Sequence, residues 1–197
     1  MTGNATARRS LVAGGILVAA AALAGSGLRW NGSGSLPRGL YLVRTAGRQP
    51  APMALVLVCP PQGAGELAAE RGYLPRGSCP GGPQPLGKLL LAGAGDRIDL
   101  APDGLSVNGT PVPGSRLQRT DAAGRPLPHV PYGTYLLRHG QIWTFSPHPR
   151  SFDSRYFGPV TDLRGSLVPL LVTPDVAIEA FVDTWRRRSA ARRTTLL

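Results

Sequence analysis

Residues 11–28 hold eighteen apolar or small side chains and no charge. This run separates a short N-terminal segment from the rest of the chain, which is called the body below. A helix of this length just spans a bilayer. The alternative is a cleaved signal peptide, whose apolar region is typically about 7–15 residues, and Ala22–Ala24 resembles its small-residue cleavage site. Because the apolar run continues past that point, we expect an uncleaved anchor at residues 10–28, after a cytoplasmic N-terminus at residues 1–9.

The body of the chain is expected outside the cytoplasm. Arginines occur on both sides of the apolar run, so the positive-inside rule does not decide the orientation, and long domains cross a membrane largely regardless of their charge. The sequence therefore predicts a single-pass protein of the bacterial inner (cytoplasmic) membrane. Residues 29–174 would form its periplasmic, or otherwise extracytoplasmic, domain.

The body is rich in turn-forming residues. The 197 residues include 26 glycines and 20 prolines, which is about twice the usual share. Such a composition can indicate disorder, but a hydrophobic content of 42% and regular apolar runs favour a folded core. We therefore expect a mainly β, antiparallel domain with an N-terminal transmembrane helix and a short C-terminal helix. The strand candidates are Leu40–Arg44, Met53–Val58, Lys88–Ala92, Arg97–Leu100, Gly133–Arg138, Gln141–Phe145 and Ser166–Val172.

Local signals add a hairpin and two helices. The dipeptide Asn108-Gly109 lies between the triplets LSV and TPV and is favoured in two-residue hairpin turns. One helix is predicted near residues 65–71, and residues 175–197 are expected to form a C-terminal helix and a basic tail. The arginines of that tail would suit anionic lipid headgroups, although a solvated basic tail is an equal alternative. The helix has one apolar face for packing, formed by Ile178, Phe181, Val182 and Trp185.

The chain contains two cysteines, Cys59 and Cys79, in a segment with turn residues at both ends. An even pair in an exported domain predicts a disulfide. Closing a loop of about 20 residues would stabilise the fold by roughly 3 kcal/mol on the chain-entropy model. In a cytosolic body the same residues would be free thiols.

The basic residues leave one candidate general base apart from the histidines. Of the 22 basic residues only Lys88 is a lysine, and arginine keeps its proton at any accessible pH whereas a desolvated lysine can lose it. The three histidines lie in loops, and no Gly-x-Ser-x-Gly elbow accompanies them, so a Ser-His-Asp triad is not favoured. No phosphate-binding glycine loop or zinc-type Cys/His spacing is present, which argues against nucleotide-driven and zinc-finger functions. We expect neither a metal nor a cofactor.

The segment after the apolar run carries candidate nucleophiles. Ser33 and Ser35 lie among glycines, which let a backbone approach a substrate closely. Pro37 and Gly39 then fix a turn before an apolar strand. A flexible Gly-Ser linker is the alternative, but a linker alone would not require the ordered Ser-x-Pro-x-Gly-x-Tyr that follows.

Three segments, in this order after a single anchor, resemble the type I signal peptidases with a Ser-Lys dyad: SLPRGLY at 35–41, GKLLLAGAGDRI at 87–98 and SFDSRYFGPV at 151–160. The first and third segments, together with RGYLPRGSCPGG, are most similar to the conjugative-transfer (TraF-like) branch. The resemblance covers roughly residues 10–172. It implies a signal-peptidase-like antiparallel β domain.

The resemblance also implies roles for individual residues. Ser35 matches the nucleophile and Lys88 the general base. Ser33 matches the hydroxyl that completes the oxyanion hole with the backbone N–H of Ser35, and Ser151 matches a serine that orients the lysine amine. One departure is Ala94, where the family usually has a proline, and we expect it to loosen a turn.

Asp153 and Arg155 match a supporting ion pair, with Ser154 between them. A lysine can serve as base only if its pKa falls from about 10.4 towards 7–8. Burial lowers the pKa of Lys88 and a nearby arginine does the same, whereas a free carboxylate would oppose both. We therefore predict that Arg155 pairs with Asp153 and screens Lys88 from the carboxylate. A purely structural role for the pair remains the alternative.

These observations predict a membrane-anchored serine endopeptidase that processes exported, membrane-tethered precursors, with pilin precursors of a conjugation system as candidate substrates. The resemblance implies small residues, typically Ala, at the substrate's P1 and P3 positions, and the chain near residues 36–43 could add the substrate as an extra strand. The acyl-enzyme could be resolved by water or by the precursor's own amine, which gives a cyclic product. The expected partners are the precursor and the lipid bilayer, without nucleic acid. The alternative is a non-catalytic structural or nucleic-acid-binding component of a DNA-transfer apparatus.

Overall fold

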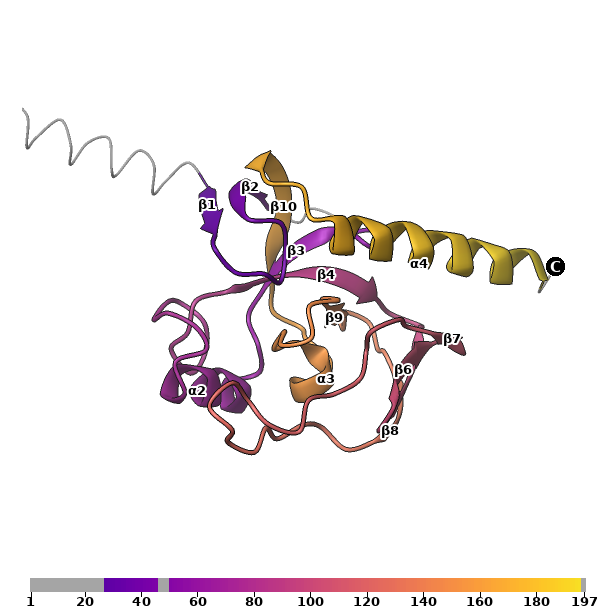
Figure 1. Ribbon diagram of the computed structural model, residues 1–197, viewed down its shortest axis with the longest axis horizontal. Coiled ribbons are helices and arrows are strands. Elements are labelled where there is room, and N and C mark those ends of the chain that lie inside the picture. Colours follow the sequence, from indigo (N-terminus) through magenta and orange to yellow (C-terminus); the bar gives the residue numbers. More distant parts are fainter. Residues whose placement is uncertain (1–26, 46–49, 196–197) are drawn as a thin grey trace, which may run out of the picture.

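The computed structural model describes residues 27–45 and 50–195. Figure 1 shows helix α3 near the centre of the view, with helix α2 on one side of it and strands β6–β8 on the other. In this view helices α4 and α2 lie on opposite sides of strand β4. The helices are α2 (Gln62–Glu70), α3 (Ser154–Phe157) and α4 (Val176–Thr195). The strands are β1 (Leu28–Asn31), β2 (Gly39–Arg44), β3 (Leu55–Val58), β4 (Leu86–Ala92), β5 (Arg97–Ala101), β6 (Gly104–Val107), β7 (Thr110–Pro111), β8 (Gly133–Leu136), β9 (Trp143–Phe145) and β10 (Leu163–Val172).

The strands form two antiparallel sheets, which confirms the mainly β prediction. The larger sheet has the order β1-β2-β10-β3-β4-β9 and the smaller one β7-β6-β5-β8. Strand β2 lies between β1 and β10, and a Cβ added at Gly39 would lie 2.1 Å from the carbonyl oxygen of Leu171 on β10. Both edges of β2 are therefore occupied, and the expectation that a substrate strand adds along residues 36–43 is wrong for the β2 part of that segment.

The predicted strands are present with ends shifted by a few residues. The hairpin at Asn108-Gly109 is confirmed, because both residues have positive φ angles (50° and 73°) between β6 and β7. Strand β1 was not predicted. It begins at Leu28, inside the segment assigned to the anchor, so the apolar run concealed the start of a strand.

The core joins both sheets and α4. Its main cluster includes Leu89 and Leu91 of β4 together with Ile178, Phe181 and Trp185 of α4, and Val182 packs against the same cluster. The predicted packing face of the C-terminal helix is thus confirmed. A second, smaller cluster lies on the opposite face of β4 and contains Val56, Val58, Leu86, Leu90, Ile142, Phe157 and Val160.

The C-terminal helix is longer than predicted. Helix α4 has 20 residues and ends at Thr195, so the arginine-rich sequence continues the helix, in keeping with the good helix propensity of arginine and alanine. No helix in the described part of the chain is both long and apolar enough to cross a membrane. The predicted anchor at residues 10–28 lies almost entirely outside that part.

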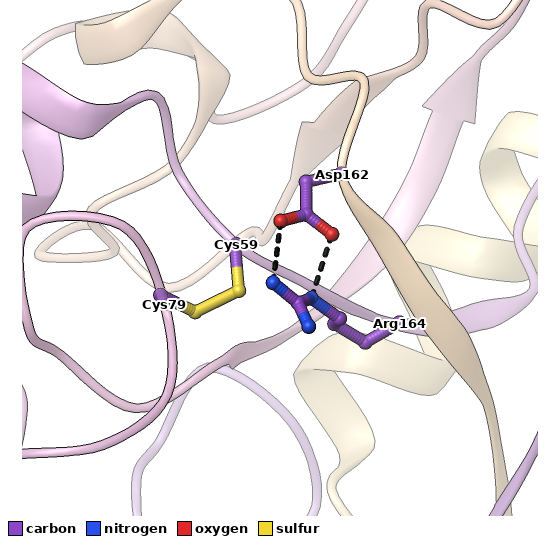
Figure 2. The surroundings of a disulfide bond; sticks show 4 residues. All are labelled: Cys59, Cys79, Asp162 and Arg164. Carbon is purple, nitrogen blue, oxygen red and sulfur yellow. Dashed lines mark hydrogen bonds and ion pairs between the residues drawn. A yellow bond between two sulfur atoms is a disulfide. The ribbon is translucent and has the colours of Figure 1, made fainter.

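The two cysteines form the predicted disulfide (Figure 2). Cys59 follows β3 and Cys79 lies beyond α2, so the bond fixes the segment that contains α2 to the end of a sheet strand. The backbone N–H of Cys59 donates to the carbonyl of Asp162, whose side chain pairs with Arg164 beside the disulfide.

Candidate active site

The loop between β1 and β2 carries both candidate serines, and the side chain of Asn31 holds this loop in a defined shape. Its Oδ1 atom accepts hydrogen bonds from the backbone N–H of Ser33 (3.2 Å) and from the Ser33 hydroxyl (2.8 Å). Its amide group faces the carbonyl oxygens of Ser33, Leu36 and Pro37 at 3.0–3.1 Å. The Gly-Ser sequence is therefore an ordered turn and not a flexible linker.

Leu36 packs this loop against the strand that carries the lysine. Its side chain is 1% exposed, and a Cβ added at Gly87 would lie 2.9 Å from its Cδ1 atom. The absence of a side chain at Gly87 thus allows Leu36 to approach β4 closely. Ser35 precedes Leu36 and Lys88 follows Gly87, so this contact brings the two segments together.

Lys88 lies on β4 with its side chain 2% exposed. It pairs with Val56 of β3 and shares a face with Leu86 and Leu90, because alternate residues of a strand point to the same side. Burial is the largest cause that lowers the pKa of Lys88, from its usual 10.5 to about 8. Of the three leucines that follow Lys88 in the sequence, Leu90 alone shares the lysine's face.

The predicted pairing of Asp153 with Arg155 is confirmed. The guanidinium donates from Nε to Oδ1 and from Nη2 to Oδ2, each at 2.8 Å, and both side chains are fully buried. The carboxylate raises the pKa of Lys88 and the guanidinium lowers it, so the two charges act in opposite directions on the amine. The Asp153 carboxylate also accepts from the backbone N–H groups of Ser146 and Arg155 and so caps helix α3.

The hydroxyl groups of this region divide into two roles. Ser35 lies with its Oγ atom 3.4 Å from the Oγ of Ser151, which is 2% exposed. Ser154 is fully buried, and its Oγ accepts from the backbone N–H of Thr144 at 2.9 Å, which ties α3 to β9. Ser151 therefore belongs beside the nucleophile candidate, whereas Ser154 supports the scaffold.

These groups meet in one cavity of about 640 Å³. Ser33, Ser35, Lys88 and Ser151 all line it. Residues of the disulfide-fixed segment and of the chain near residue 120 also line the cavity. A 2.6 Å hydrogen bond from the Tyr73 hydroxyl to Asp121 joins these two segments. The cavity can therefore hold a peptide segment against a hydroxyl and a buried amine.

His148 also lines the cavity, and its ring lies against Gly34. Its Nδ1 atom accepts from the backbone N–H of Arg150 at 3.3 Å. This bond ties the ring to the loop at residues 148–150.

The structure thus gathers all seven predicted active-site residues into one region, as a cavity lining or as its immediate support. The predicted contact between Ser151 and the lysine amine remains a prediction. The turn at Ala94 is closed by a hydrogen bond, since the Asp96 side chain accepts from the backbone N–H of Gly93 at 2.9 Å, and the expected loosening stays a prediction. Asn31 was missed, although an Asn before a Gly-Ser turn is a known signal for side-chain capping of the backbone.

Within residues 27–45 and 50–195, no group of three or more His, Cys, Asp or Glu side chains is placed to hold a metal ion.

A family model described as signal peptidase, peptidase S26, matches residues 6–165. The chain is 41% identical over 147 residues to a plasmid transfer protein TraF of Escherichia coli, covering 74% of this chain and 81% of that protein. It is 38% identical over 157 residues to a conjugal transfer protein TraF of Agrobacterium fabrum, covering 78% of this chain and 88% of that protein. A crystal structure of a signal peptidase I from Enterococcus faecalis shares 18% identity at a TM-score of 0.34, over 61% of this chain and 98% of that one.

Proposed function

The chain belongs to the signal peptidase family, peptidase S26, and is a serine-peptidase-type enzyme, and from this premise we propose that Ser35 and Lys88 form its catalytic dyad. The observation that carries the proposal is the placement of Lys88. The chain's single lysine is buried in the cavity that contains Ser35, and its pKa is lowered to about 8. A buried lysine with such a pKa is neutral often enough near neutral pH to accept a proton.

The proposed reaction begins with proton transfer from the Ser35 hydroxyl to the neutral amine of Lys88. The serine oxygen attacks the carbonyl carbon of the scissile peptide, and the carbonyl oxygen becomes an oxyanion. The backbone N–H of Ser35 and the hydroxyl of Ser33 stabilise this charge. Lys88 then protonates the leaving amine, and an acyl-enzyme on Ser35 remains.

The acyl-enzyme has two possible acceptors. Water gives a linear product, whereas the precursor's own amino group gives a cyclic product by transpeptidation. In both cases the incoming nucleophile loses a proton to Lys88, and the Ser35 hydroxyl is restored. The same dyad therefore serves both outcomes.

We further propose that the enzyme acts at the bacterial inner membrane on exported, membrane-tethered precursors. The segment predicted as an anchor ends where β1 begins, and Ser35 lies four residues after the last residue of β1. This short connection would hold the cavity at the membrane surface. The names of the TraF relatives support a role in conjugative transfer, with pilin precursors as the candidate substrate class.

The test uses the full chain in vesicles with a synthetic precursor that consists of an apolar transmembrane segment followed by Ala-x-Ala. We expect the wild type to cleave this precursor and Ser35→Ala to be inactive. The matched control His148→Ala changes another side chain of the cavity lining and should remain active. Product mass separates the two outcomes, because a cyclic product is lighter than the linear one by one water molecule.

Equal cleavage by the wild type and Ser35→Ala would refute the dyad. Loss of activity in His148→Ala together with retained activity in Lys88→Met would assign the base to histidine instead.

A further inference from the structure

We propose that Asn31 is a positioning residue for the oxyanion hole, which holds the Ser33 hydroxyl and the nucleophile loop ready for the transition state. The inference rests on the proposed function. It adds a residue that neither the sequence motif nor the cavity chemistry assigned, and it predicts how that residue acts on the rate.

Asn31 controls both ends of the loop with one side chain. It is the last residue of β1 and pairs with Gly39, the first residue of β2, so the loop begins and ends at this pair. The amide group of Asn31 reaches the carbonyl oxygens of Leu36 and Pro37 near the far end of the loop, at 3.0 and 3.1 Å. Its Oδ1 atom holds Ser33 near the other end.

A second brace acts on the far end alone. The Tyr41 hydroxyl donates to the carbonyl oxygen of Pro37 at 2.6 Å, and Tyr41 is 1% exposed. Burial, and then the charge of Asp175, raise the pKa of Tyr41 to about 12, so its hydroxyl keeps the proton that it donates. Tyr41 therefore braces the loop without touching Ser33, whereas Asn31 does both.

The hydroxyl of Ser33 has one proton to donate, and in this structure it lies 2.8 Å from Oδ1 of Asn31, to which it donates. That acceptor is a neutral amide. A hydrogen bond to a charged acceptor is about twice as strong as a neutral one, so the hydroxyl turns to the substrate oxygen only when negative charge develops there. Oδ1 keeps its bond from the backbone N–H of Ser33 and is not left without a partner.

In the transition state Asn31 therefore acts through its bonds to the loop backbone, which keep the Ser33 hydroxyl within reach of the developing oxyanion. An interaction that strengthens only as charge develops raises kcat and leaves KM largely unchanged. Loss of an oxyanion donor typically costs about 10²–10³ in kcat. Loss of Asn31 leaves the Ser33 hydroxyl present but no longer held in position, so we expect a smaller fall in kcat, of about 10- to 100-fold.

The test is a double-mutant cycle in the vesicle assay with the Ala-x-Ala precursor, using Asn31→Ala and Ser33→Ala singly and together. If Asn31 acts through the Ser33 hydroxyl, Asn31→Ala lowers kcat less in the Ser33→Ala background than in the wild type. The matched control Tyr41→Phe removes only the brace on Pro37 and should lower kcat by the same factor in both backgrounds. KM should change less than threefold in Asn31→Ala, as a rough bound.

A second variant guards against loss of the fold. Asn31→Asp keeps the size of the side chain, loses the amide donors and offers Ser33 a charged acceptor that competes with the oxyanion. Its kcat, measured on protein that circular dichroism shows to be folded at the assay temperature, should fall at least as far as in Asn31→Ala. Equal losses of Asn31→Ala in both Ser33 backgrounds, or wild-type kcat in Asn31→Asp, would overturn the inference. Activity in Ser35→Ala would instead refute the proposed function itself.

Discussion

Replacement of Lys88 by methionine should abolish catalysis and make the folded protein more stable. The gain in the free energy of unfolding should depend on pH. The pKa of Lys88 falls from 10.5 to about 8 on folding, mainly through burial. One pKa unit corresponds to about 1.4 kcal/mol, so holding the protonated amine in the folded protein costs roughly 3 kcal/mol. Methionine is close to lysine in size and carries no charge, and its side chain suits a site beside Leu86 and Leu90.

The sign follows from proton binding in the two states. Below about pH 8 the amine is protonated in both states, and the full cost of burying the charge is present. Between about pH 8 and pH 10.5 the unfolded chain binds more protons than the folded one, so the wild type gains stability as the pH rises. Above that range both states hold a neutral amine and the cost is absent.

The assay is chemical denaturation of the full chain at about pH 6.5 and at about pH 10.5, as a difference between Lys88→Met and the wild type. We expect Lys88→Met to be more stable by roughly 3 kcal/mol at the lower pH and nearly equal at the higher pH. Ser35→Ala is the control and should show no such dependence. An equal difference at both pH values, or a destabilised Lys88→Met at the lower pH, would refute the reasoning.

Three further changes test the support of the site. Gly87→Ala should lower kcat about tenfold in the vesicle assay and destabilise the fold by about 1–3 kcal/mol on denaturation, because a packed core must make room for a methyl group. In the control Gly63→Ala the added methyl group meets no atom within 4 Å, so this variant should not be destabilised. Arg155→Met should cost about 3–5 kcal/mol by leaving a buried carboxylate unpaired, and Asp153→Asn in the same chain should restore part of that loss on denaturation. Reduction of the disulfide should lower the free energy of unfolding by roughly 3 kcal/mol, and an unchanged denaturation midpoint would contradict this.

The chemistry of the site was readable from the sequence because it depends on residue types that are rare in this chain. A single lysine in a chain of arginines leaves Lys88 as the candidate general base. A buried carboxylate next to a lysine needs a partner, and Arg155 lies two residues away on the same segment. The resemblance of residues 151–160 to the signal peptidases thus implied the ion pair, and charge balance gave the physical reason for it.

The shape of the nucleophile loop could not be read in the same way. Asn31 acts through carbonyl groups of residues up to six positions away, and those carbonyls converge only after β1 and β2 pair. The approach of Leu36 to Gly87 depends equally on the packing of distant segments. Strand β1 was missed for a related reason, since its first residue, Leu28, is also the last residue of the uncharged run that was interpreted as an anchor.

The C-terminal helix shows the limit of composition. Arginine-rich sequence was taken to mark a basic tail, yet the residues that follow Trp185 continue α4 to Thr195. Charge decides whether a segment is solvated and does not by itself end a helix. No glycine or proline occurs between Val176 and Thr195 to end it earlier.

The most direct measurement of the central claim is an NMR titration of Lys88 in the full chain labelled only at lysine. Because the chain has one lysine, its side-chain resonance needs no assignment and reports the amine alone. We expect the resonance to titrate with a pKa of about 8, and the pH dependence of precursor cleavage to follow the same curve. A titration at the usual lysine value of about 10.4, or cleavage that does not follow it, would contradict the assignment of Lys88 as the general base.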